Sequence, residues 1–213
     1  MDHVATELLR SMYSTESQLG AGGALYYLDD ITKISREQGE FLYEFHKTNK
    51  PVLSVEVGLA YGFSTVWLLS AMKDGDYGHH IAIDPFEDMH WNGIGRTRAS
   101  LLGMEDRFTF MAEPSLIALP RLIEEKRQAQ FIFIDGDHKF DGVFLDFVLS
   151  AHLCAEGGHI VLDDMWMPSI RKVVRFIERN RSDFSARPCP INNVSIFEKT
   201  GTDTRDWRHF VEF

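Results

Sequence analysis

The sequence predicts an α/β fold in which helices cover both faces of a seven-stranded, mostly parallel sheet, as three observations indicate. Short apolar runs rich in β-branched residues indicate buried strands. Stretches with apolar residues three and four apart separate them and indicate helices. One of these helices has Val66, Leu69 and Met72 on its apolar face, another is predicted to end at Gly157-Gly158, and a third to begin at Pro168. The alternation of strand and helix requires parallel strands joined by right-handed crossovers. The predicted strands are residues 52–57, 80–84, 107–111, 131–134, 159–163, 181–188 and 193–198. The last two are predicted to form an antiparallel pair, so one strand near the C-terminus opposes the others.

Composition fits a single globular domain and argues against several kinds of partner. The chain has 213 residues, of which 44% are hydrophobic and 25% charged, and its formal net charge is -10. Such a negative charge disfavours a nucleic-acid partner, since phosphate binding needs clustered Lys and Arg. No apolar run reaches the roughly 20 residues of a membrane helix, and no signal segment opens the chain. We therefore expect a soluble, cytoplasmic protein, with Cys154 and Cys189 reduced.

Residues 1–34 are predicted to form an N-terminal arm, and residues 35–213 the main domain. The arm opens with a weakly amphipathic segment, followed by Gly20-Ala21-Gly22-Gly23, which predicts a flexible connection. Its simplest role is packing, and the alternative is a lid or an oligomer contact near a substrate pocket. Ser35-Arg36-Glu37-Gln38 has the pattern of a capping box and predicts a helix that extends to about Lys47.

The first strand leads into a glycine-containing turn, which predicts a ligand site. Gly58 and Gly62 allow a tight reversal and close approach to a ligand, and Ser64 opens the next helix. The spacing E-x-G-x-A-x-G fits a pyrophosphate-binding dinucleotide turn poorly, because Ala60 and Phe63 stand where that fingerprint has glycine. Glu56 would repel a pyrophosphate but would accept hydrogen bonds from a cationic amine.

Asp84 ends the second strand just before a proline, about 26 residues after the first turn begins. In a nucleotide-binding α/β fold, an acid at this position hydrogen-bonds a ribose diol. We therefore predict that Asp84 contacts a ribose. The alternative is an aspartate that merely ends the strand.

The fourth and fifth strands both end in acidic residues. Phe131–Ile134 is followed by Asp135-Gly136-Asp137-His138, and His159–Leu162 by Asp163-Asp164. Neighbouring strands would bring Asp135, Asp163 and Asp164 together at the edge where α/β sheets bind ligands. A bound Mg²⁺ would remove the mutual repulsion of the three carboxylates. The alternative is that the acids separately cap helices and turns in solvent. His138 is ordinarily neutral near pH 7 and could accept a proton from a hydroxyl.

These motifs together resemble a known enzyme family. The glycine turn resembles motif I of the class I S-adenosylmethionine-dependent methyltransferases, which have a Rossmann-like three-layer fold. The I-D-G-D-H and L-D-D motifs resemble the catechol and caffeoyl-CoA O-methyltransferase type and its bacterial small-molecule relatives, over about residues 35–198. In that type, the positions of Asp135, Asp163 and Asp164 bind Mg²⁺ or a similar ion. This chain departs from the pattern at His138, where lysine is usual, and at Asp164, where asparagine is common.

The resemblance implies transfer of a methyl group from S-adenosylmethionine to a hydroxyl of a small organic molecule, assisted by a divalent metal. Asp135 and His138 would be catalytic, and Asp135, Asp163 and Asp164 would bind the metal. The cofactor-binding residues would be Glu56, Gly58, Ala60, Gly62, Ser64, Asp84, Ala112, Glu113, Pro114 and Asp135. Of these, Ala112, Glu113 and Pro114 follow the third strand and would hold the adenine.

Two alternatives stay open at this point. One is a nicotinamide-dependent oxidoreductase, which Ala60, Phe63 and the lack of a Tyr-x-x-x-Lys pair disfavour. The other is a metal-independent binding protein with the same fold. We expect a small-molecule acceptor and a homo-oligomer, with no nucleic acid or membrane as partner. The sequence does not identify the acceptor, although His90-Trp91-Asn92 and the arm are predicted to shape its pocket.

Overall fold

The structure is a computed structural model of the chain and describes residues 1–14, 17–29 and 32–213. Its main sheet has seven strands in the order β5-β4-β3-β6-β7-β9-β8, and a separate two-stranded sheet pairs β1 with β2. The predicted fold class is confirmed, because only β9 opposes the other strands of the main sheet. The chain divides into two compact units, Met1–Pro114 and Ser115–Phe213.

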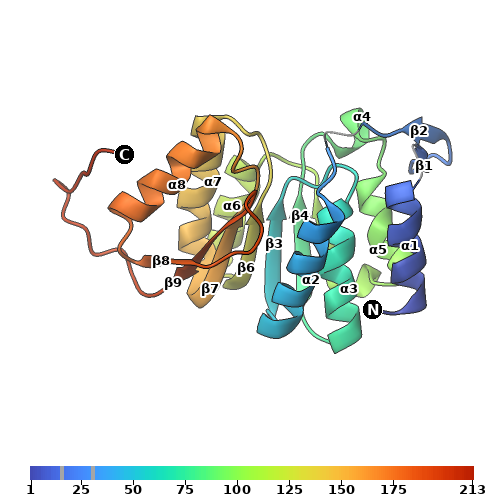
Figure 1. The fold of residues 1–213 in the computed structure, drawn as a ribbon, viewed down its shortest axis with the longest axis horizontal. Coiled ribbons are helices and arrows are strands. Elements are labelled where there is room, and N and C mark those ends of the chain that lie inside the picture. The colour runs from blue at the N-terminus through green and yellow to red at the C-terminus, as the bar shows by residue number, and fades with distance from the viewer. Residues whose placement is uncertain (15–16, 30–31) are drawn as a thin grey trace. The chain divides into compact units, whose positions relative to one another are not determined.

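The first unit contains the N-terminal hairpin and three parallel strands (Figure 1). Its helices are α1 (His3–Ser14), α2 (Arg36–Asn49), α3 (Phe63–Gly75), α4 (Glu87–His90) and α5 (Arg98–Leu102), with short 3-10 turns at Gly95–Thr97 and Glu105–Arg107. Its strands are β1 (Ser17–Leu19), β2 (Leu25–Tyr27), β3 (Leu53–Val57), β4 (His79–Ile83) and β5 (Phe108–Met111). The register pairs Glu56 with Ala82 and His80 with Phe108.

Helices α2 and α3 lie side by side in this unit (Figure 1). The side chain of Ser35 accepts a hydrogen bond from the backbone nitrogen of Gln38, so the predicted cap of α2 is confirmed. Helix α3 is buried from Phe63 to Met72. It begins one residue before the predicted start at Ser64, because Gly62 adopts a left-handed conformation and caps it.

The predicted flexible connection at Gly20–Gly23 is the turn of a hairpin, which the sequence did not predict. These residues form the turn between β1 and β2, where Gly23 N donates to Gly20 O at 2.9 Å and Gly20 N donates to Ala24 O at 2.9 Å. Gly23 has a φ of +79°, which a tight reversal of this kind requires and which glycine adopts without strain. The arm is therefore a helix followed by a hairpin; its residues 15–16 and 30–31 lie outside the described part of the chain.

The second unit contains the remaining four strands of the main sheet. Its helices are α6 (Ser115–Glu124), α7 (Phe140–Leu153) and α8 (Pro168–Asn180), and its strands are β6 (Ala129–Ile134), β7 (Cys154–Leu162), β8 (Phe184–Arg187) and β9 (Ser195–Lys199). Strands β6 and β7 are parallel, and β9 pairs antiparallel with both β7 and β8. Pro168 at the first position of α8 confirms the predicted start of that helix.

The glycine pair Gly157-Gly158 does not end α7, as the sequence had suggested. The helix ends at Leu153, and both glycines lie within β7. The pairing of β6 with β7 shifts register between Ala129 and Phe131, and a side chain on Gly158 would come within 2.9 Å of a backbone oxygen. The glycines thus accommodate an irregularity in the strand.

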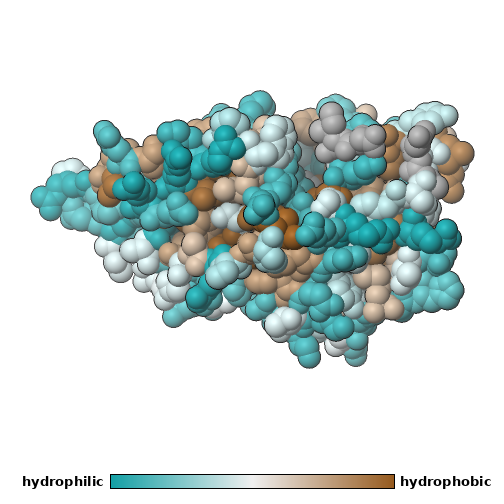
Figure 2. Space-filling view, viewed as in Figure 1, coloured by the Kyte–Doolittle hydropathy of each residue, from teal (hydrophilic) through white to brown (hydrophobic). Residues whose placement is uncertain are grey.

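Apolar side chains form the interior of both units, and polar ones dominate the face drawn in Figure 2. Buried residues line the central strands β3 and β6 almost without interruption: β3 is buried at all five positions, and β6 at five of six. Strands with two buried faces are typical of a sheet covered by helices on both sides. No helix within the described residues is both long and apolar enough to span a bilayer.

Candidate active site

The turn after β3 has a backbone that strongly favours glycine. Gly58, Ala60 and Gly62 all have positive φ angles, of 94°, 45° and 73°. Gly58 N donates to Ile83 O at 2.9 Å, and Gly62 N donates to Leu59 O at 2.8 Å. For Ala60 this conformation costs about 1–2 kcal/mol. We call residues 58–62 the glycine loop. Strain of this kind persists where surrounding contacts hold it, and it is common at functional sites.

Asp84 holds the glycine loop in place. Its Oδ2 accepts hydrogen bonds from the backbone nitrogens of Leu59 at 3.1 Å and Ala60 at 3.0 Å, and its Oδ1 accepts from Phe86 N at 2.8 Å. The side chain is buried, with 5% exposed. Each carboxylate oxygen can accept more than one bond, so a ribose contact is compatible with this loop-supporting role and stays a prediction.

Glu56 belongs to a buried polar network between β3, β4 and α3. Its Oε2 lies 3.1 Å from Nε2 of His80 and accepts a hydrogen bond from the hydroxyl of Thr65. Nδ1 of His80 lies 2.8 Å from the hydroxyl of Ser54. Glu56 is fully buried, and its Oε1 has no partner among the described residues. The predicted amine contact of Glu56 stays untested. Sequence reasoning missed His80 and Thr65, although polar residues in and beside buried strands signal such a network.

The glycine loop rests against the segment that follows β4. A side chain on Gly95 would come within 2.3 Å of Ala60 O, and one on Gly62 within 2.8 Å of Cγ of Arg98. Arg98 is 1% exposed and donates from Nε to Tyr61 O at 3.1 Å. Sequence reasoning missed Arg98, because nothing in a short helical stretch distinguishes a buried arginine from a solvated one.

The other predicted cofactor residues of this unit lie at the ends of their elements. Ser64 is buried in the first turn of α3, with 5% exposed. After β5, Ala112 is exposed, while Glu113 and Pro114 are half-buried. Glu113 N donates to Met111 O at 2.9 Å, which turns the chain away from the strand. The parallel pairing brings the carboxyl ends of β3, β4 and β5 to one edge, where α/β sheets bind ligands.

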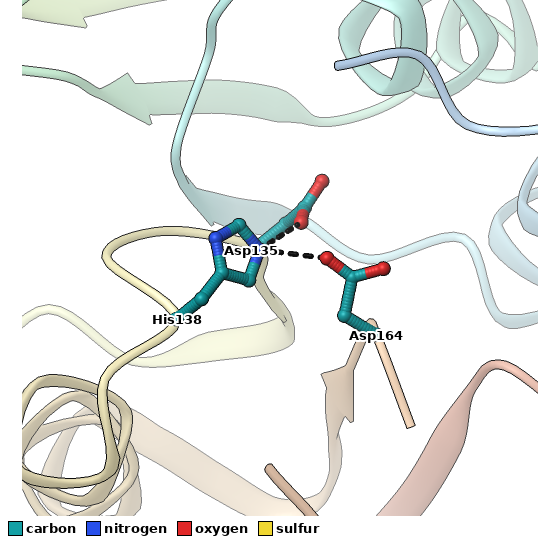
Figure 3. A group of neighbouring side chains, drawn as sticks. All are labelled: Asp135, His138 and Asp164. Carbon is teal, nitrogen blue, oxygen red and sulfur yellow. Dashed lines mark hydrogen bonds and ion pairs between the residues drawn. The ribbon is translucent and has the colours of Figure 1, made fainter. Parts of the chain in front are cut away.

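The second unit brings Asp135, His138 and Asp164 together (Figure 3). Nε2 of His138 lies 2.8 Å from Oδ2 of Asp164 and 3.4 Å from Oδ1 of Asp135. Asp135 follows β6, and Asp164 lies two residues after β7, so the two parallel strands position both carboxylates. We call these three residues the acidic cluster. All three are half-buried.

The two carboxylates change the ionisation of the histidine. Hydrogen bonds to Asp135 and Asp164 raise the pKa of His138 to about 10, against the opposing effect of burial. The pKa of Asp164 is lowered, because hydrogen bonds from His138, Trp166 and Asn193 outweigh its partial burial. The expectation of a neutral imidazole near pH 7 is therefore wrong for this arrangement. Two adjacent carboxylates stabilise the imidazolium.

Asp163 stands apart from the acidic cluster. It is buried, with 3% exposed, and its Oδ1 accepts hydrogen bonds from Asp164 N at 2.7 Å and from Nδ2 of Asn193 at 2.9 Å. Asp164 has a φ of +57°, so its side chain diverges from that of its neighbour. The structure thus brings two of the three predicted aspartates together and adds His138. The predicted metal role of Asp163 stays a prediction.

Sequence reasoning missed two further residues that contact the acidic cluster. Nε1 of Trp166 donates to Oδ1 of Asp164 at 2.8 Å, and Nδ2 of Asn193 lies 3.3 Å from the same oxygen. The Trp166 side chain is nevertheless 64% exposed. A tryptophan two residues after a pair of aspartates was a usable signal. The pairing with Asn193, about 30 residues away, was not.

Comparison with known proteins agrees with this architecture. Among solved structures, the chain is similar to an O-methyltransferase from Bacillus cereus in complex with S-adenosylhomocysteine, with a TM-score of 0.68 and 21% identity, covering 93% of this chain and 92% of that one. It is also similar to the O-methyltransferase TomG from Streptomyces achromogenes in complex with S-adenosylmethionine, with a TM-score of 0.67 and 18% identity, covering 94% and 91%. At these identities, the likeness establishes the Rossmann-like fold of methyltransferases.

A family model for a methyltransferase domain matches residues 55–165, just over half of the chain. The chain therefore belongs to this methyltransferase family. A catechol O-methyltransferase from Mycobacterium tuberculosis is 26% identical over 132 residues, which are 62% of this chain. The match spans 56% of the length of that relative.

Proposed function

We propose that the protein transfers the methyl group of S-adenosylmethionine to a hydroxyl of a small organic molecule. The observation that carries this proposal is the extent of the family match. Residues 55–165 include every residue that the sequence predicted for the site, from Glu56 to Asp164. The partial similarity to a catechol O-methyltransferase supports oxygen as the methyl acceptor.

We assign cofactor binding to the first unit. The glycine loop lets a ligand approach the backbone closely, since Gly58 and Gly62 carry no side chain and Ala60 carries only a methyl group. Asp84 keeps that loop fixed through three backbone nitrogens. A preformed loop spares the cofactor much of the entropic cost of ordering its own site. Solved structures of the same fold hold S-adenosylhomocysteine or S-adenosylmethionine, which supports the assignment.

We assign binding and activation of the methyl acceptor to the acidic cluster. A hydroxyl must lose its proton as its oxygen attacks the methyl group, and a carboxylate of Asp135 or Asp164 can accept that proton beside the His138 imidazolium. Trp166 and Asn193 orient Asp164 by hydrogen bonds to its other carboxylate oxygen, Oδ1. The remaining contribution is positioning, because correct alignment alone can supply several kcal/mol of rate enhancement.

The cluster also fits a divalent cation. Asp135, His138 and Asp164 each offer one ligand atom, and these atoms lie within 4.8 Å of one another. An imidazole beside two carboxylates favours a transition-metal dication such as Mn²⁺ or Zn²⁺ over Mg²⁺, which prefers oxygen ligands. Such an ion would displace the proton of the His138 imidazolium, because only the neutral imidazole binds a metal, and it would lower the pKa of a bound hydroxyl. We therefore propose a metal site at these three residues, which would bind Mg²⁺ more weakly than Mn²⁺ or Zn²⁺.

Chelation tests the metal site. We expect EDTA to reduce methyl transfer by at least about tenfold, and Mn²⁺ or Zn²⁺ to restore it at lower concentration than Mg²⁺ does. Equilibrium dialysis provides a readout independent of activity: Asp164→Ala should abolish tight binding of Mn²⁺. Full activity in EDTA would remove the metal from the mechanism.

A matched pair of substitutions tests the catalytic assignment. Asp135→Asn should lower turnover by about 10²–10⁴-fold, the usual range for loss of a proton-transfer group. S-adenosylhomocysteine affinity should stay within about tenfold, which corresponds to about 1.4 kcal/mol. Asp137→Asn is the control, since Asp137 lies in the same loop but pairs with Lys139 in solvent at 2.7 Å. Isothermal titration and a labelled-methyl assay measure both quantities. Equal losses of affinity and turnover for Asp135→Asn would show that the residue is structural.

A further inference from the structure

The N-terminal hairpin is joined to the glycine loop by a buried arginine. From the first position of α5, Arg98 donates from Nε to the backbone oxygen of Tyr61 at 3.1 Å. From Nη1 it donates to Oε1 of Gln18, in β1, at 3.3 Å. One guanidinium thus bridges the loop assigned to the cofactor and the hairpin of residues 17–29.

Two more contacts hold the hairpin, one to the glycine loop and one to the segment after α4. The hydroxyl of Tyr61 donates to Oδ2 of Asp29 at 3.3 Å. The backbone nitrogen of Ala21, at the turn of the hairpin, donates to Asn92 O at 3.0 Å, and a side chain on Gly93 would come within 2.6 Å of Cβ of Ala21. The hairpin is therefore held at its turn and just after β2, as well as through Gln18.

The alternation of the hairpin explains why Gln18 is the inward residue. The register pairs Leu19 with Leu25 and Ser17 with Tyr27, which places these four on one side and Gln18 on the other. Leu19, Leu25 and Tyr27 are 59%, 67% and 83% exposed, whereas Gln18 is 6% exposed. The polar residue Gln18 thus occupies the buried side of the hairpin, whereas apolar residues lie on its exposed side.

Core stability alone does not account for Arg98. It is 1% exposed, and its Nη2 has no partner among the described residues. Burying a charged group with unsatisfied donors is costly, and an apolar side chain of similar size is often neutral or stabilising instead. The arginine supplies what an apolar residue lacks, namely directed bonds to two separate segments.

We propose that Arg98 is a positioning residue that couples docking of the hairpin to binding of S-adenosylmethionine at the glycine loop. The inference rests on the proposed function and deepens it. A ligand that fixes the loop also fixes Tyr61 O, and through Arg98 it favours the docked hairpin. Linkage is reciprocal, so the docked hairpin must increase cofactor affinity by the same factor.

Hydrogen–deuterium exchange of the full chain, with and without S-adenosylhomocysteine, tests the coupling. In the wild type, saturating ligand should slow exchange of residues 17–29 by about three- to tenfold, the effect of one ordinary hydrogen bond. Gln18→Leu, of similar volume but without an acceptor, should abolish this protection. It should also weaken ligand affinity by about the same factor.

Three further variants keep the test specific. Gln18→Glu keeps the acceptor for Arg98 but loses the donor that Gln18 gives to Ser11 O at 3.4 Å, so it should retain the coupling. Leu25→Gln changes the outward face of the hairpin and should also retain it. Tyr61→Phe removes the bond to Asp29 alone and should reduce the protection only in part, which provides a second variant if Gln18→Leu folds poorly.

The outcomes separate this inference from the proposed function. Wild-type protein that binds S-adenosylhomocysteine without any change in hairpin exchange would overturn the coupling and leave the function standing. The coupling is also overturned if Gln18→Glu behaves like Gln18→Leu, because packing or the Ser11 bond would then be responsible. Failure of the wild type to bind the ligand would overturn the proposed function, and the coupling with it.

Discussion

Glu87 is a carboxyl group that the fold buries close to the glycine loop. It is 1% exposed, its Oε1 accepts from Arg96 N at 3.0 Å, and its Oε2 has no partner among the described residues. Burial, together with the nearby charges of Asp84 and Asp88, raises the pKa of Glu87 to about 8. At neutral pH the folded protein therefore holds this side chain mainly in the protonated form.

This ionisation predicts a stability that declines as pH rises. Below about pH 4.5 the folded and unfolded states both carry the proton, whereas between there and pH 8 only the folded state keeps it. The free energy of unfolding should fall across that window by at most about 5 kcal/mol, because a pKa difference of one between the two states corresponds to about 1.4 kcal/mol. Glu87→Gln mimics the protonated group and should flatten the slope. Urea titrations at pH 5 and pH 8.5 measure it.

The exposed Glu124 gives the control, since Glu124→Gln should leave the slope unchanged. If Glu87→Gln and the wild type lose stability in parallel between pH 5 and 8.5, other groups carry the dependence and Glu87 is ionised in the folded state.

Single residues also mark the limit of sequence reasoning. Asp84, Asp135 and Asp164 each lie just after an apolar run. Because the end of such a run marks the end of a buried strand, the placement of these acids could be predicted. The different orientation of Asp163 could not, since it depends on a left-handed backbone at Asp164 and on a bond to distant Asn193. The buried Arg98 gave no sequence signal for the same reason, because its partners come from separate segments of the chain.

At the scale of elements, periodicity located most helices and strands but misjudged two glycine-rich segments. Gly20–Gly23 was expected to be flexible, yet it is the turn of a hairpin whose strands have only three residues each. Gly157-Gly158 was expected to stop a helix, yet it lies within β7. Glycine permits a turn, a bulge or a helix end equally well. The choice is made by the tertiary partner, Asn92 O for the first segment and strand β6 for the second.

Helix α3 shows the opposite case, in which local signals were sufficient. Its apolar residues Val66, Leu69 and Met72 are fully buried, as their spacing predicted. The helix is buried on every side over Phe63–Met72, which the predicted apolar face understated. The difference arises because α2 packs against it and covers a second face, and such coverage depends on the fold as a whole.

At the scale of the whole chain, ligand linkage decides between the two nucleotide classes that a β-turn-α unit can bind. A ligand that binds only the folded protein stabilises it by about 2.7 kcal/mol at one hundred times its Kd. For a chain of this size, 1 kcal/mol corresponds to about 2–4 °C in Tm. Saturating S-adenosylhomocysteine should therefore raise Tm by about 5–10 °C.

NAD should leave Tm unchanged, because Ala60 and Phe63 replace two glycines of its fingerprint. The fully buried Glu56, two residues before the glycine loop, offers acceptor oxygens where a pyrophosphate would need donors. A thermal scan with both ligands, each at a matched concentration series, makes the comparison on one preparation. Stabilisation by NAD and not by S-adenosylhomocysteine would reverse the assignment of the glycine loop, even though the fold would be unchanged.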